Sequence, residues 1–145
     1  MNSIIKHFTI ESHQPTEVID ITRLVLEFQE KSPIKEGMLF VMTRHTTTAL
    51  LVTEGLSCIE EDILNNLDRL FPKQLDYHHH RYLPDDGCVG YNADAHLKSI
   101  FTGYFLYFPI ENQVILKGSR QTIYLVELYG PSTREIIIQG WGELA

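Results

Sequence analysis

The first half of the chain carries two kinds of hydrophobic pattern. Residues 3–11 alternate closely enough between apolar and polar positions to predict a strand. From Thr16 onward the apolar positions follow a helical spacing instead, at Val18, Ile21, Leu24, Val25 and Phe28. The apolar runs 38–42 and 49–52 then predict two short buried strands, with His45 between them. This half therefore predicts a strand, a helix and two more strands.

The second half begins with a helix and ends in strands. Ser57 opens a capping-box pattern, and Pro72 is expected to end the helix that follows. Residues 72–91 are polar and predict a loop, and loops of this length are usually functional or mobile. Asn92 is expected to cap a second helix, which Gly103 stops. Four strand-like runs complete the chain, at 104–110, 113–116, 121–129 and 134–139.

These elements predict an α+β fold, a single-domain β-sheet or partly open barrel with helices packed on one face. A chain of 145 residues fits one domain, residues 1–145, with a real core. Its formal net charge of −7 argues against general binding to nucleic acid or to an anionic membrane. No apolar run approaches the ~20 residues needed to span a bilayer. Cys58 and Cys88 share no close spacing, so we expect a reduced, cytoplasmic protein.

Three histidines in polar, turn-like contexts are the strongest candidates for chemistry. His45 precedes three threonines, His79 is the centre of a histidine triplet, and His96 follows an aspartate and an alanine. Neutral imidazole is the commonest metal ligand and the usual acid or base near neutral pH. The spacing of the three fits no local zinc motif, so only the fold could unite them. The residues alone leave open a shared site or three histidines satisfied by solvent and local hydrogen bonds.

Two neighbouring features bear on such a site. We expect the triplet to be extended, so that His78 and His80 face away from His79. Glu54, just past the second short strand, is a candidate base or a partner that orients an imidazole. The alternative for Glu54 is an exposed loop carboxylate.

An anion site is a further candidate near the end of the chain. Ser132, Thr133 and Arg134 offer hydroxyls, turn amides and a guanidinium fork, and Arg120 could supply a second cation. The alternative is a β-turn with a surface arginine.

Several short blocks occur in a characteristic order along nearly the whole chain. They are residues 45–54, Tyr77-x-His79, residues 92–97, residues 118–127 and residues 132–134. In this order and spacing they resemble the YjbQ-type family, also called UPF0047 and labelled secondary thiamine-phosphate synthase. The last two blocks look like the family's closing β-hairpin.

This resemblance implies an α+β domain that assembles as a homotrimer, with sites near subunit contacts. It implies that histidines from three blocks gather around a metal or an anion, and by position these are His45, His79 and His96. Gln121, in the closing blocks, joins the serine, threonine and arginine above as a candidate for binding substrate or phosphate. Family members are associated with weak thiamine-phosphate synthase activity, which joins a pyrimidine pyrophosphate to a thiazole phosphate and expels pyrophosphate.

The chain also departs from the family pattern at three positions. Arg120 stands where an aromatic residue is expected, Thr53 where asparagine is usual, and Tyr104 where a small hydroxyl residue is typical. These changes leave the three histidines in place and alter the wall around them.

Two functional hypotheses follow. In the first, the protein is a metal-assisted enzyme acting on a phosphorylated small molecule, and bound zinc or magnesium neutralises phosphate charge or activates water. His45, His79 and His96 would bind the metal, with catalytic roles for Glu54 and His45, and Arg134 would hold the phosphate. In the second, the protein is a non-catalytic trimer that binds a metal or a small ligand. An open coordination position would favour the enzyme, and a closed tetrahedral shell would favour a structural metal.

Overall fold

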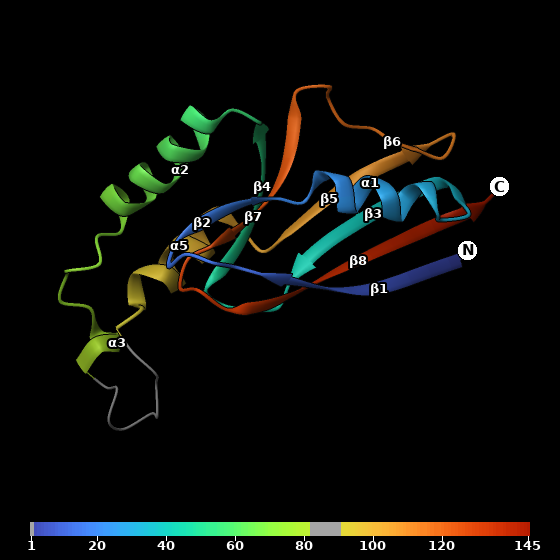
Figure 1. Ribbon diagram of the computed structural model, residues 1–145. Coiled ribbons are helices and arrows are strands. Elements are labelled where there is room, and N and C mark those ends of the chain that lie inside the picture. The colour runs from blue at the N-terminus through green and yellow to red at the C-terminus, as the bar shows by residue number, and fades with distance from the viewer. Residues whose placement is uncertain (1, 82–90) are drawn as a thin grey trace.

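The polypeptide forms two β-sheets with helices packed against them, as the computed structural model in Figure 1 shows. The structure describes residues 2–81 and 91–145. The strands are β1 (Asn2–Glu11), β2 (Glu17–Asp20), β3 (Ile34–Thr43), β4 (Thr48–Glu54), β5 (Phe105–Glu111), β6 (Val114–Ile115), β7 (Gln121–Glu127) and β8 (Thr133–Leu144). The helices are α1 (Thr22–Glu30), α2 (Ser57–Leu70), α3 (His78–Arg81) and α5 (Ala93–Thr102). None of the described helices combines the length and the apolar character needed to cross a bilayer.

The larger sheet is built around its last strand. Its order is β1-β8-β3-β5-β6, and β8 pairs antiparallel with β1 on one side and with β3 on the other. Gly37 of β3 and Gly142 of β8 face each other, both with positive φ. A Cβ on Gly142 would lie 2.0 Å from the carbonyl oxygen of Glu36, so this close backbone approach requires glycine.

The smaller sheet has the order β2-β7-β4, and with the larger one it forms a strongly curled half-barrel. Helix α1 contacts strands of both sheets, and its Val25 and Phe28 are buried in the main core. That core also takes residues from both sheets: Ile34, Leu39, Val41, Leu50, Phe108, Ile110, Ile115, Ile123, Leu125, Ile136 and Ile138. A smaller cluster attaches α2 and α5 to β4 and β7 through Ala49, Leu67, Ala95, Val126 and Leu128. The predicted α+β fold is confirmed.

The helix predicted from Thr16 is wrong in its first part. Residues 17–20 form strand β2, and α1 begins only at Thr22. Val18 and Ile19 are β-branched and pair with β7, so sheet pairing overrides the helical spacing. Asp20 then accepts a hydrogen bond from the Thr22 amide at 2.8 Å, which turns the chain into the helix.

The two predicted helix caps also differ from expectation. The N-cap of α2 is Leu56, and no side chain caps that helix, so the capping box at Ser57 is wrong. Asn92 does occupy the N-cap of α5, but its side-chain oxygen lies 3.0 Å from Nε2 of His79 instead of capping the helix. The predicted loop 72–91 contains the one-turn helix α3, and its residues 82–90 lie outside the described part of the chain.

The expected closing β-hairpin is wrong as well. Strand β7 lies between β2 and β4 in the smaller sheet, whereas β8 lies between β1 and β3 in the larger one. Residues 128–132 therefore carry the chain from one sheet to the other. Residues 44–47 make the same change between β3 and β4, and Leu128 donates its backbone N–H to the carbonyl of Thr47 at 3.1 Å. The two crossings lie together, and they position the candidate site.

Candidate functional site

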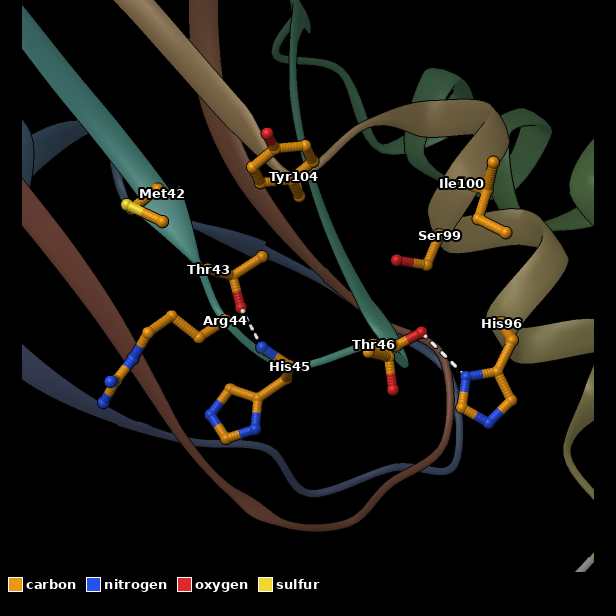
Figure 2. Close-up of a pocket in the computed structure, with 9 residues that line it drawn as sticks. All are labelled: Met42, Thr43, Arg44, His45, Thr46, His96, Ser99, Ile100 and Tyr104. Atoms are coloured by element: carbon orange, nitrogen blue, oxygen red, sulfur yellow. Dashed lines mark hydrogen bonds between the residues drawn. The ribbon is translucent and has the colours of Figure 1, made fainter.

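A pocket of about 500 Å³ lies where β3 ends and β4 begins, against helix α5 (Figure 2). This volume is in the range of small-molecule sites. Helix α5 is fixed beside β4 because Ser99 Oγ donates to the Thr48 carbonyl at 2.6 Å and the Leu50 amide donates to the Gly103 carbonyl at 3.0 Å. The pocket is lined by Met42, Thr43, Arg44, His45, Thr46, His96, Ser99, Ile100 and Tyr104.

His45 is held in the wall of this pocket by its backbone and by its ring. Its amide donates to Thr43 Oγ1 at 3.2 Å, and its Nε2 accepts the Glu135 amide proton at 3.0 Å. Because an amide N–H only donates, we assign the lone pair to Nε2 and the proton of the neutral ring to Nδ1. Partial burial, and after it the positive charge of Arg134, lowers the pKa of His45 below its ordinary value. The imidazole is therefore neutral near pH 7.

His96 reaches the same pocket from helix α5. Its Nδ1 lies 3.2 Å from the carbonyl oxygen of Thr46, the residue that follows His45. A carbonyl only accepts, so Nδ1 carries a proton, and the lone pair of the neutral ring belongs to Nε2. Asp94 does not share this face of the helix, because it is buried and receives a hydrogen bond from Lys98 at 2.9 Å. The fold thus brings two of the three singled-out histidines to one pocket.

The third, His79, lies on the far side of His96. The prediction of an extended triplet is wrong, because His78–Arg81 is one turn of helix. The His79 ring packs edge-to-face on His96 with centroids 5.2 Å apart. His79 lines a neighbouring cavity of about 420 Å³ together with His78 and His96, whereas His80 accepts the Ala93 amide proton at the start of α5. His96 therefore lines both cavities.

The three histidines do not fit a shared metal in this arrangement of the chain. Among the described residues, no group of three or more His, Cys, Asp or Glu side chains is placed to hold a metal ion. At His45 the Glu135 amide engages the lone pair of Nε2 and Nδ1 carries the proton, whereas a metal needs a free lone pair. Zinc or magnesium at His45, His79 and His96 stays a prediction.

Arg134 lies in the interior, against the crossing 44–47 that carries His45. It is 8% exposed, so the alternative of a surface arginine is wrong. Its Nε and Nη2 donate to the two Glu127 oxygens at 2.7 and 2.6 Å, and Nη2 also donates to Thr47 Oγ1 at 3.0 Å. Burial raises the pKa of Glu127, but hydrogen bonds from Arg134, the Tyr129 amide and the Ser12 hydroxyl outweigh it, and the net shift is downward. A phosphate could bind the Nε and Nη2 edge of this guanidinium only by displacing Glu127.

The other residues of the predicted anion site bind neighbouring strands. Ser132 donates its amide to Ser12 Oγ at 2.8 Å. Thr133 Oγ1 lies 2.9 Å from both carboxylate oxygens of Glu11. These contacts hold the start of β8 against the end of β1, and neither residue lines the pocket.

Glu54 and Gln121 lie at the opposite end of the smaller sheet from His45. They are paired across β4 and β7, and Arg120 donates to Glu54 at 3.1 Å. His45 precedes the start of β4 and Glu54 ends it, a separation of about 20 Å along the strand. Within one chain, Glu54 and Gln121 therefore do not reach His45.

Sequence reasoning missed three residues that line the pocket or support it. Arg44 precedes His45, and as a basic residue in an acidic chain it carried a usable signal. Ser99 follows His96 by three residues, a spacing that places both on one face of a helix. Glu127 is a carboxylate within the apolar run 121–129, which was a signal for a buried ionic partner.

The fold and the site define a small α+β half-barrel protein whose pocket is lined by histidines at a crossing between two sheets. Residues 6–143 match the family described as UPF0047 protein YjbQ-like, and the chain belongs to that family. A UPF0047 protein of Archaeoglobus fulgidus is 36% identical over 131 residues, which cover 90% of this chain and 96% of the relative. The UPF0047 protein YugU of Bacillus subtilis is 29% identical over 140 residues, which cover 96% of this chain and 100% of the relative.

Solved structures of family members share the fold. A YbjQ-like protein of unknown function from Sulfolobus solfataricus P2 superposes with a TM-score of 0.90 at 30% identity, covering 98% of this chain and 99% of that one. An uncharacterised YjbQ/UPF0047 protein from Clostridium acetobutylicum gives a TM-score of 0.82 at 31% identity, covering 92% and 97%. The family expected from the sequence blocks is confirmed.

Proposed function

We propose that the pocket between His45 and His96 binds a phosphorylated small molecule and that the protein is an enzyme acting on it. The observation that carries this proposal is the lining of the pocket, which among the described residues includes the cation of Arg44, two imidazoles and no carboxylate, in a chain of net charge −7. A locally basic pocket in an acidic protein attracts anions selectively. Met42 and Ile100 add apolar wall for the remainder of the ligand.

In this proposal the phosphate contacts Arg44, not the buried Arg134. Arg44 Nη2 donates to Glu135 Oε1 at 2.8 Å, and the two side chains are 65% and 37% exposed. Exposed ion pairs of this kind contribute little free energy. Arg44 can therefore exchange Glu135 for a phosphate at low cost, and a planar guanidinium binds phosphate with two parallel hydrogen bonds.

The reaction to test first is a thiamine-phosphate synthase-like transfer. In it the thiazole nitrogen bonds to the methylene carbon of the pyrimidine, the carbon–oxygen bond of the pyrophosphate ester breaks, and pyrophosphate leaves. His45 Nδ1–H and Arg44 would donate hydrogen bonds to the departing phosphate oxygens, which stabilises the developing charge. The three departures from the family pattern make other phosphorylated substrates equally important to screen.

We further propose that the protein is a homotrimer in the cytoplasm. The outer face of the larger sheet exposes aromatic side chains on adjacent strands, namely Phe40, Phe105, Tyr107 and Trp141. Exposed apolar patches of this kind mark association surfaces. Met42 pairs with Phe105 in the sheet and lines the pocket, so a neighbouring subunit on this face would lie beside the site. The exposed free thiol of Cys58 suits a reducing compartment.

The test is a binding and turnover screen on untagged protein. Metal content is measured first, and phosphorylated metabolites, including the pyrimidine pyrophosphate and thiazole phosphate pair, are then titrated by calorimetry. Arg44→Gln should weaken binding of any phosphorylated hit about tenfold or more, because hydrogen bonds to charged groups contribute roughly 1.5–3 kcal/mol. Arg23→Gln is the matched control, because Arg23 is an exposed arginine of α1 paired with Glu27.

Equal affinity in the Arg44→Gln and Arg23→Gln proteins, or no binding of any phosphorylated compound, would contradict the proposal. Binding without turnover of any hit would favour the alternative, a non-catalytic ligand-binding trimer.

A further inference from the structure

The two pocket histidines have opposite hydrogen-bonding polarity, and backbone groups set it. We infer that His45 presents only a donor, Nδ1–H, to the ligand, whereas neutral His96 presents an acceptor, Nε2, so that the pair selects the ligand by polarity. The inference rests on the proposed function for the identity of the ligand. The tautomers themselves rest only on the contacts of the two rings.

The polarity of His45 follows from one contact. Its Nε2 lies 3.0 Å from the Glu135 amide nitrogen, at the point where β8 passes behind the pocket. The opposite tautomer would put two N–H groups against each other and leave the amide of a paired strand without an acceptor. Leaving this part-buried donor without an acceptor costs up to about 1–3 kcal/mol, which corresponds to a preference of up to roughly a hundredfold for the Nδ1–H form.

The tautomer of His96 is set by a backbone carbonyl, whereas that of His45 is set by a backbone amide. Its Nδ1 faces the Thr46 carbonyl oxygen at 3.2 Å, and that oxygen requires a proton on Nδ1. Figure 2 shows the two rings on either side of Thr46. The backbone amide of His45 donates to Thr43 Oγ1, and the ring of His96 donates to the Thr46 carbonyl. The crossing between β3 and β4 therefore orients the imidazole of His96, whereas the amide of Glu135 in β8 orients that of His45.

This polarity narrows the class of ligand. An oxyanion suits the side of His45, because phosphate oxygens accept hydrogen bonds and Arg44 lies next to it. A hydroxyl or amine suits the side of His96, because Nε2 accepts. The expected ligand is a phosphate ester that carries a separate hydrogen-bond donor.

Histidine tautomers can be measured directly. In full-length protein labelled with ¹⁵N-histidine, long-range ¹H–¹⁵N spectra near neutral pH should show His45 protonated at Nδ1 and unprotonated at Nε2. The resonances of His45 are assigned from their loss in His45→Gln. A proton on Nε2 of His45, or a mixture of the two tautomers, would overturn the inference.

Matched variants test the consequence for binding, with inorganic phosphate as the probe. Asparagine places an amide donor near the position of Nδ1, and glutamine places its amide near Nε2. His45→Gln should weaken phosphate binding about tenfold, the loss of one charge-assisted hydrogen bond, and His45→Asn should weaken it less. His13→Gln, at an exposed histidine between β1 and β2, controls for the substitution itself.

The outcomes separate the two proposals. If wild-type protein binds phosphate but His45→Asn is impaired as much as His45→Gln, the donor role of His45 is wrong while the proposed function stands. If wild-type protein binds neither inorganic phosphate nor any phosphorylated compound of the screen, the proposed function fails, and the tautomer spectrum alone decides the polarity. Thermal melts of both variants confirm that each protein is folded.

Discussion

At the scale of single residues, the ion pair between Arg134 and Glu127 determines how firmly the His45 segment is held. Glu127 is fully buried, and Arg134 connects it to Thr47. Ser12 donates to the same carboxylate, so β1, β7, β8 and the 44–47 crossing meet at one charge pair. Removing one member of such a pair leaves the other charged and buried, which costs far more than the pair contributes when intact.

Arg134→Ala should therefore lower the free energy of unfolding by about 3–5 kcal/mol. Urea denaturation measures this change. Arg44→Ala removes an exposed arginine of the same segment and should cost less than about 1 kcal/mol. Similar losses in the two variants would mean that the buried pair is not the anchor of the crossing.

The pH profile gives a second readout of the same pair. The net pKa shift of Glu127 is downward, so its contribution to stability is present above the unfolded carboxylate value, about 4.3, and is lost as the pH falls through the folded pKa. In Glu127→Gln the unfolding free energy should lack this part of the acid dependence. Parallel pH profiles for the wild type and Glu127→Gln would argue against the assignment.

At this scale the sequence indicates which residues are candidates for the site, but not the surroundings of their side chains. His45 and His96 could be chosen from their polar contexts, and the fold does bring them to one pocket. Arg134 could be chosen too, and Glu127 stands out as a carboxylate within an apolar run, but nothing local shows that these two side chains pair with each other. The tautomers depend on backbone groups of Glu135 and Thr46, which only the folded chain supplies.

At the scale of elements, Lys98 connects α2 to α5. It is 2% exposed, and its ammonium donates to Asp68 of α2 at 2.6 Å and to Asp94 of α5 at 2.9 Å. Burial lowers the pKa of Lys98, but the two carboxylates outweigh it, and the net shift is upward. Helix α2 buries fully only Leu67, and its other attachments are the partly buried Ile63 and Leu64 and a hydrogen bond from Tyr124 to Glu60 at 2.8 Å.

Lys98→Met should lower the free energy of unfolding by about 3 kcal/mol, because Asp94 is left buried without its cation. Amide hydrogen exchange should accelerate along α2 more than along α1, since α2 loses its tie to α5. Lys31→Met, at an exposed lysine that follows α1, is the control and should change neither quantity. Unchanged exchange in α2 would show that the apolar contacts alone hold it.

The positions of most helices and strands were predictable from the sequence, but the pairing of the strands was not. Local periodicity located most strands and both long helices. It failed at residues 17–20, where pairing with β7 overrides a helical spacing. It also failed at the last two strands, because adjacency in sequence suggests a hairpin, whereas β7 pairs with β2 and β4 and β8 pairs with β1 and β3.

At the scale of the whole molecule, the outer face of the larger sheet is unusually aromatic. Tyr107 is 60% exposed and Trp141 42% exposed, and Phe40 lies between them as the partner of Tyr107 in the sheet. A face of this composition gains free energy when a second copy covers it, at about 25 cal/mol for each Å² of apolar surface removed from water.

Sedimentation at micromolar concentration should show a trimer. Tyr107→Lys should shift the protein toward smaller species, because burying an unpaired ammonium in the contact is costly. Leu56→Lys places the same charge on an exposed apolar residue at the start of α2, outside that face, and should leave the sedimentation unchanged. A monomeric wild type would exclude the trimer, and with it any contribution from a neighbouring subunit to the pocket.

The central position of β8 also has a consequence for how the chain is made. Strands β1 and β3 are synthesised within the first 43 residues, yet they do not pair with each other, and the strand that joins them spans residues 133–144. On a ribosome the early strands must wait with open edges until nearly the whole polypeptide has emerged. During that interval they are exposed to aggregation, and we expect chaperones to matter more for newly made chains of this protein than for its mature form.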